Sequence, residues 1–101
     1  MVDDMRYNVE NGTLTIFLEG EVNSHNAEDV EKEIDGIIAA NTFKAVVLDL
    51  KMLKYTSSAG LRIIVRLKQQ YDDTSLVNVP KDIYDIFAMV GFQNLMKIER
   101  L

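Results

Sequence analysis

The sequence predicts a small α/β domain in which strands and helices alternate in the order ββαβαβα(β). Three observations support this fold class. Two segments near the N-terminus alternate apolar and polar residues, as half-buried strands do, and Asn11-Gly12 between them is a strong signal for a hairpin turn. Three longer segments carry apolar residues at spacings of three and four, the period of an amphipathic helix. Short apolar runs separate these segments, so we expect parallel strands joined by right-handed crossovers, added to the antiparallel hairpin.

The bulk composition is that of one domain spanning residues 1–101. The chain is 48% hydrophobic, which is enough for a single core. No apolar run approaches the roughly 20 residues that a membrane span requires, and the acidic N-terminus lacks the apolar segment of a signal peptide. The chain contains no cysteine, so a disulfide framework and a thiolate metal site are excluded. These features are consistent with a cytoplasmic location.

The net charge of −5 bears on the class of partner. Binding to nucleic acid depends mostly on Lys and Arg that neutralise phosphates, and we find no basic stripe in this acidic sequence. Anionic membranes are disfavoured for the same reason. Proteins and small molecules remain as candidate partners.

We expect the hairpin strands over residues 5–9 and 13–19. Residues 21–25 follow as a polar loop, and Ser24 or Asn26 caps the next helix, which ends near residue 40. The residues expected to be buried are Leu14, Ile16 and Leu18 in the second strand, and Ala27, Val30, Ile34, Ile37 and Ile38 in the helix.

Residues 43–50 form the next predicted strand, which is nearly continuously apolar, as in strands that helices cover. After a loop at residues 51–57, a second helix runs from about Ser58 to Tyr71. Its predicted buried side carries Leu61, Ile64, Val65 and Leu67, with Arg62, Arg66 and Gln69 facing solvent.

The C-terminal part continues the alternation. Residues 75–79 form a short strand, and Pro80 suits the first turn of the helix that follows. Gly91 ends that helix in the left-handed conformation, and Phe92 packs back on its last turn. Residues 95–98 are either a weak final strand or a half-turn of helix. The predicted buried stripe of the last helix carries Ile83, Ile86, Phe87 and Val90.

We expect no enzymatic activity, no cofactor and no metal. The only histidine is His25, so motifs with two histidine ligands cannot be built. A serine nucleophile needs a base within hydrogen-bond reach; His25 could serve Ser58, yet the Gly-x-Ser-x-Gly motif is absent. We therefore interpret His25 as a solvated loop residue, a helix cap or a partner contact.

The hydroxyl-rich turn at residues 56–60 has two interpretations. Ser57 or Ser58 can be a helix N-cap, with Gly60 allowing close packing of helix on strand. Alternatively, one serine accepts a phosphate, because a dianion at a helix N-terminus meets unpaired N–H groups and a favourable dipole. Both can hold at once.

Four segments resemble those of the STAS domain of the anti-sigma-factor antagonist family. They are residues 20–23 with Asn26-Ala27, the apolar strand at 46–50, the loop at 55–61, and the helix end at 86–92. The resemblance spans residues 8–100, and the order and spacing of the segments are specific. It implies a STAS-like mixed sheet packed with helices.

The resemblance also implies a bacterial cytosolic switch protein. Unphosphorylated members bind an anti-sigma factor that is also a serine kinase, which releases the sigma factor. The kinase then phosphorylates one loop serine, the complex dissociates, and a serine phosphatase resets the cycle. The matching position is Ser58, with Ser57 as the alternative. We expect a monomer whose partner-binding residues are Asn23, Ser24, His25, Thr56, Ser57, Ala59 and Arg62.

Two departures from the family pattern remove negative charge near Ser58, since Ser57 and Asn23 stand where family members often have Asp. Arg62 could pair with a phosphate on Ser58 or remain a solvated charge. Met52, Leu53 and Tyr55 lie in the loop before the serines; we expect at least one of them to pack in the core and the rest to be available for contact with a partner. Alternative functions are an adaptor that is never phosphorylated, as in a transporter or signalling complex, and a nucleotide- or anion-binding module that uses the helix N-terminus.

Overall fold

The computed structural model describes residues 5–101, so the first four residues of the acidic N-terminus lie outside the described part of the chain. The predicted alternation of strands and helices is confirmed. The elements are β1 (Tyr7–Glu10), β2 (Thr13–Phe17), β3 (Gly20–Val22), α1 (Ala27–Ala39), β4 (Ala45–Asp49), β5 (Leu53–Thr56), α2 (Ser58–Gln70), β6 (Thr74–Val79), α3 (Lys81–Met89), the 3₁₀ helix η2 (Phe92–Asn94) and β7 (Lys97–Arg100).

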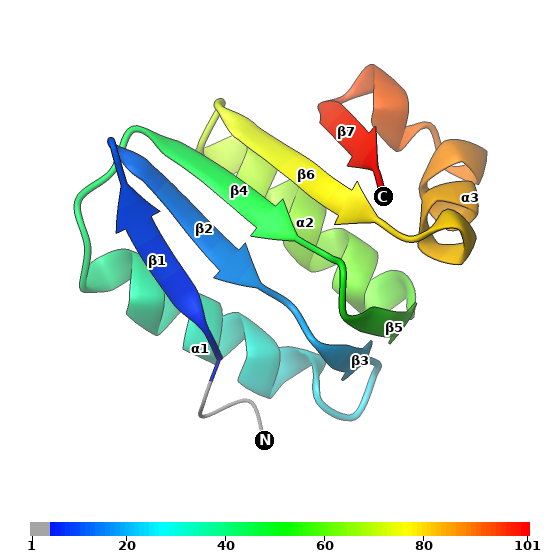
Figure 1. Ribbon diagram of the computed structural model, residues 1–101. Helices are drawn as coiled ribbons and strands as arrows, with labels where there is room; N and C mark the ends of the chain where they lie inside the picture. The colour runs from blue at the N-terminus through cyan, green and yellow to red at the C-terminus, as the bar shows by residue number, and fades with distance from the viewer. Residues whose placement is uncertain (1–4) are drawn as a thin grey trace.

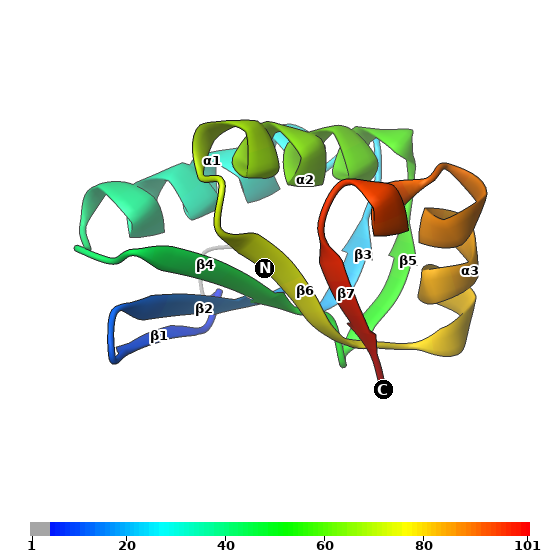
Figure 2. The same ribbon diagram turned by 90° about the horizontal axis from the view of Figure 1, so that it is seen from above.

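The main sheet has five strands in the order β1-β2-β4-β6-β7. The predicted hairpin pairs β1 antiparallel with β2, and its turn places Asn11 and Gly12 at positive φ. The other pairings are parallel, with Leu14 of β2 opposite Val46 of β4. Helices α1 and α2 cover one face of this sheet, and α3 lies beside it (Figures 1 and 2).

A second sheet is a two-stranded parallel ribbon of β3 and β5. The sequence analysis treated both segments as loops, which was wrong. The strands have three and four residues, their pairing shifts register between Gly20 and Glu21, and the burial pattern of β5 does not alternate. Neither strand therefore carries the period-two signal by which strands are found in a sequence.

The core lies between the main sheet and its helices. It contains Leu14 and Ile16 of β2, Leu18 in the connection after β2, and Val30, Ile34 and Ile37 of α1. Ala27 and Ile38, which were also expected to be buried, are only half-buried at the edge of this core. In α2 the buried residues are Gly60, Ile63, Ile64 and Leu67, while Leu61 and Val65 are only half-buried. Gly60 has no apolar side chain, so the apolar pattern did not identify it as buried. The predicted buried face of α2 is therefore rotated about the helix axis relative to the observed one.

The C-terminal helix ends as predicted, with Gly91 at a φ of 80° and the ring of Phe92 stacked on Phe87 at a centroid distance of 5.1 Å. Pro80 sits at the N-cap, one position before the predicted first turn. Val90 is 53% exposed and lies outside the buried stripe, because it ends the helix instead of continuing it. Of the two alternatives for residues 95–98, the strand is the one observed, because β7 begins at Lys97, whereas the 3₁₀ helix η2 lies just before this segment.

Within residues 5–101, no helix is long and apolar enough to cross a membrane.

Candidate functional site

The β3–β5 ribbon determines where the hydroxyl-rich turn lies. Val22 at the end of β3 is in register with Thr56 at the end of β5, and the Ser57 N–H donates to the Val22 carbonyl at 2.9 Å. Both strands run in the same direction, so the residues after them emerge at the same end. The loop that begins at Asn23 therefore lies beside the turn that begins at Ser57.

Ser57 is the N-cap of α2. Its backbone is extended, and its Oγ accepts a hydrogen bond from the Ala59 N–H at 3.2 Å. Its carbonyl oxygen also accepts from the N–H groups of Gly60 at 3.0 Å and Leu61 at 3.2 Å. The capping interpretation is thus confirmed for Ser57, whose hydroxyl is engaged in holding the helix start.

Ser58 is the first residue of α2, and its side chain is exposed. Within residues 5–101, neither its hydroxyl nor its backbone N–H has a hydrogen-bond partner. An unpaired N–H at the start of a 13-residue helix lies at the positive end of the helix dipole. The position can therefore accommodate a negative charge on the Ser58 oxygen.

Thr56 and Gly60 are buried beneath the turn and pack against each other. Thr56 is only 5% exposed, and a Cβ added to Gly60 would lie 2.1 Å from its Oγ1 and 3.1 Å from Val22 Cγ1. The first turn of α2 thus packs directly on the ends of both ribbon strands. The prediction that Thr56 is a partner contact needs correction, because its side chain faces the helix instead of solvent.

Two asparagines shape the neighbouring loop. The Asn23 Oδ1 accepts from the N–H groups of His25 at 2.9 Å and Asn26 at 3.1 Å. Asn26 returns the contact, since its Oδ1 accepts from the Asn23 N–H at 2.8 Å. Asn26 occupies the N-cap of α1 without capping it through its side chain, which corrects the expectation that Ser24 or Asn26 does so. Ser24 and His25 are left exposed at the tip of the loop.

The remaining candidates lie along the same segment of chain. Ala59 is half-buried, and Arg62 is exposed one turn after Ser58. Tyr55 and Met52 are about half exposed, at 48% and 49%, whereas Leu53 between them is buried. The structure thus removes Leu53 from the candidate contacts and leaves Tyr55 and Met52 accessible.

A family model supplies the observation that identifies the fold family. The STAS domain model matches residues 4–100. The chain belongs to the STAS domain family. The resemblance inferred from four sequence segments is therefore confirmed.

Relatives of this STAS domain carry the names of anti-sigma factor antagonists. BtrV of Bordetella bronchiseptica, so named, is 34% identical over 91 residues, which cover 86% of this chain and 78% of BtrV. A solved structure from Thermotoga maritima with the same kind of name has a TM-score of 0.86 at 15% identity, covering 99% of this chain and 90% of that one.

Bacillus SpoIIAA has been solved in two states. The unphosphorylated form has a TM-score of 0.74 and covers 93% of this chain and 86% of its own. The phosphorylated form has a TM-score of 0.67 and covers 93% and 89%. Because both are 19% identical to this chain, they support the fold alone. The chain thus belongs to the anti-sigma factor antagonist family by sequence similarity and has its fold.

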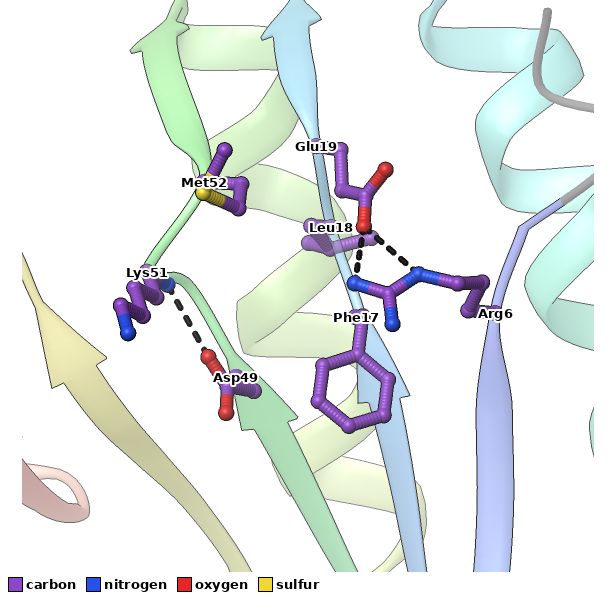
Figure 3. Close-up of a pocket in the computed structure, with 7 residues that line it drawn as sticks. All are labelled: Arg6, Phe17, Leu18, Glu19, Asp49, Lys51 and Met52. Atoms are coloured by element: carbon purple, nitrogen blue, oxygen red, sulfur yellow. Dashed lines mark hydrogen bonds and ion pairs between the residues drawn. The ribbon is translucent and has the colours of Figure 1, made fainter.

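A shallow pocket of this STAS domain lies at the other end of the ribbon from the serines (Figure 3). Arg6 pairs with Glu19, and its guanidinium lies 4.8 Å from the centre of the Phe17 ring. Asp49 Oδ1 accepts from the Lys51 N–H at 3.0 Å. Of the candidate contacts only Met52 lines this pocket, which forms where the chain leaves the main sheet for the ribbon, and the loop at Asn23 and the serine turn do not reach it.

Proposed function

We propose that this chain is an anti-sigma factor antagonist controlled by phosphorylation of Ser58. Unmodified, it binds an anti-sigma factor that is also a serine kinase and so releases the sigma factor. Phosphorylation of Ser58 dissociates the complex, and a serine phosphatase restores the binding form. In this role the chain is a monomeric cytoplasmic regulator and the substrate of the kinase, with no enzymatic activity of its own.

The observation that carries the proposal is the exposed hydroxyl of Ser58 at the first position of α2, which has no hydrogen-bond partner in the described part of the chain. The sequence relationship to BtrV, which is named an anti-sigma factor antagonist, supports it, and SpoIIAA, which shares the fold, has been solved with and without its phosphate. In the reaction, Ser58 Oγ forms a bond to the γ-phosphorus of ATP on the kinase, the bond to the leaving ADP oxygen breaks, and the hydroxyl proton passes to a base of the kinase.

The helix start tolerates the product. A phosphoserine carries about −1.5 to −2 charges at neutral pH, and a negative charge at a helix N-terminus is favourable by roughly 0.3–1 kcal/mol. The domain therefore stays folded while its surface gains a dianion. A partner surface matched to a neutral hydroxyl loses that match.

Ser58 is favoured over Ser57 as the acceptor because of one contact. Ser57 is half-buried and its Oγ already accepts a hydrogen bond from the Ala59 N–H, so its hydroxyl is less accessible to a kinase than that of the exposed Ser58. The Ser58 hydroxyl has no such role in the structure.

The test is incubation with the cognate kinase and ATP, followed by mass mapping of residues 55–62. We expect one phosphate on Ser58, retained in Ser57→Ala and lost in Ser58→Ala. A chain that remains unmodified with every candidate kinase, or that is modified on Ser57 alone, would contradict the proposal.

A further inference from the structure

The charges of this acidic chain are unevenly distributed. Residues 50–71 contain five of its 11 Lys and Arg residues and none of its 16 Asp and Glu residues. This stretch runs from the end of β4 through β5 to the end of α2 and includes Ser58. The net charge of this stretch of the chain is therefore opposite in sign to that of the whole chain.

Three of these five cations are free in the structure. Arg66 and Lys68 form ion pairs with acids from other segments. Lys51, Lys54 and Arg62 are exposed, and their side chains make no ion pair or hydrogen bond within residues 5–101. Lys51 lies in the turn after β4, Lys54 on β5 and Arg62 in the first half of α2, so the three free cations belong to one segment of the chain, residues 51–62.

Apolar side chains are also exposed in this segment of the chain. Tyr55 is 48% and Met52 49% exposed, although a tyrosine ring and a methionine gain free energy from burial. Three acids border this segment: Glu21, opposite Tyr55 on β3, accepts a hydrogen bond from Asn23 Nδ2 at 3.4 Å, and Glu19 and Asp49 line the pocket with Lys51 and Met52, Glu19 being paired with Arg6. We call the set Lys51, Met52, Lys54, Tyr55 and Arg62 the basic strip.

We propose that the basic strip is the docking surface for an acidic face of a protein partner that accepts the Tyr55 ring in an apolar pocket. This inference rests on the proposed function, because it names the chemistry of the partner. Exposed tyrosines at the centre of an interface are frequent anchors of binding energy, and complementary charges around them steer association.

The strip also supplies a reason for release. In sequence, Ser58 lies between Tyr55 and Arg62, with Lys54 close by. A phosphate of about −2 charges would offset two of the three free cations and face the acids of the partner. Phosphorylation then converts electrostatic attraction into repulsion without a change of fold.

A peptide titration tests the strip without the natural partner. The whole ¹⁵N-labelled chain is titrated with a short peptide of alternating glutamate and leucine, and the amide shifts are followed by NMR. We expect shifts confined to residues 51–62, abolished in the Lys54→Glu/Arg62→Glu variant and retained in Lys44→Glu, a single charge reversal at an exposed lysine away from the strip.

Three results of that titration would overturn the inference. They are shifts elsewhere or none, equal shifts with the peptide in which glutamine replaces glutamate, and concentration-dependent shifts of the same amides in the free chain. The last result would show that a second copy of the chain occupies the strip.

Binding to the anti-sigma factor separates this inference from the proposed function. We expect Tyr55→Ala and the double charge reversal each to weaken binding by at least about tenfold, with Tyr55→Phe and Lys44→Glu near wild type. If the complex forms and Ser58 phosphorylation releases it, but these variants bind normally, the strip is refuted and the switch survives. If the peptide binds the strip while no kinase modifies Ser58, the switch is refuted and the strip survives.

Discussion

At the scale of single residues, two adjacent serines have different tasks. The Ser57 Oγ accepts the Ala59 N–H and so holds the start of α2. The Ser58 side chain is exposed and has no partner in the described chain. Composition and spacing placed both hydroxyls at a helix start but could not separate them, because the difference depends on one backbone dihedral and one hydrogen bond.

The different roles of Ser57 and Ser58 predict that replacing each by alanine changes the free energy of unfolding by different amounts. Ser57→Ala should lower the free energy of unfolding by about 1 kcal/mol through loss of the cap, whereas Ser58→Ala should change it by less than about 0.5 kcal/mol. Urea denaturation followed by circular dichroism measures both. Equal losses, or a larger loss for Ser58→Ala, would show that the assigned roles are reversed.

The close packing of α2 on the ribbon can be tested at Gly60. Its substitution by alanine places a methyl group 2.1 Å from Thr56 Oγ1, so we expect a loss of roughly 1–3 kcal/mol from overpacking. Adding Thr56→Ala should recover part of that loss because it removes the clashing oxygen.

The matched control is Gly36→Ala in α1. Among residues 5–101, no atom outside the neighbouring helix backbone lies within 4 Å of the added carbon at Gly36, so helix propensity alone should stabilise the domain by roughly 0.5–1 kcal/mol. Equal effects of the two substitutions would refute the close packing of α2 on the ribbon.

At the scale of elements, one arginine joins the two helices that carry the loops of the site. Arg66 of α2 donates to Glu31 and, at 2.8 Å, to Asp35 of α1. It also donates to Gln70 one turn further along its own helix. Sequence analysis placed Arg66 in solvent, because its partners lie 31 and 35 residues away in the chain.

Burial lowers the pKa of Arg66, but the hydrogen bonds and charges of Asp35 and Glu31 outweigh burial and raise this pKa above its ordinary value. A raised pKa means that the guanidinium stabilises the folded state fully below its unfolded pKa and loses this effect only as pH rises through the folded pKa. Titration of Arg66 itself should therefore not change stability across the neutral range.

Arg66→Met should accordingly destabilise the domain by about 1–3 kcal/mol, the cost of losing hydrogen bonds between charged groups. Arg62→Met, which removes an unpaired charge from the same helix, should remain within about 0.5 kcal/mol of wild type. Thermal unfolding of the three proteins side by side is the measurement. Similar melting temperatures for both variants would mean that the bridge between α1 and α2 contributes nothing.

At the scale of the whole molecule, local patterns determined most of what could be predicted. The hairpin, the three helices and the parallel strands β4 and β6 each carry a period or a turn signal within their own residues. The ribbon does not, because β3 and β5 are short and are strands only through each other, some thirty residues apart in the chain. The family resemblance implies that Asn23 lies near the serine turn. The physical cause, the parallel pairing of β3 with β5, is seen only in the structure.

The central claim concerns charge on one exposed oxygen, and one measurement tests it most directly. The affinity of the anti-sigma factor is determined for the unmodified chain and for the chain fully phosphorylated on Ser58, with the melting temperature of each recorded. The variants Ser58→Asp and Ser58→Asn, equal in size but different in charge, serve as matched controls. We predict that the phosphate and the Ser58→Asp substitution weaken binding by at least about tenfold, that Ser58→Asn does so much less, and that all four chains melt within a few degrees of one another. Equal affinity for the two forms, or loss of the fold on phosphorylation, would contradict the account.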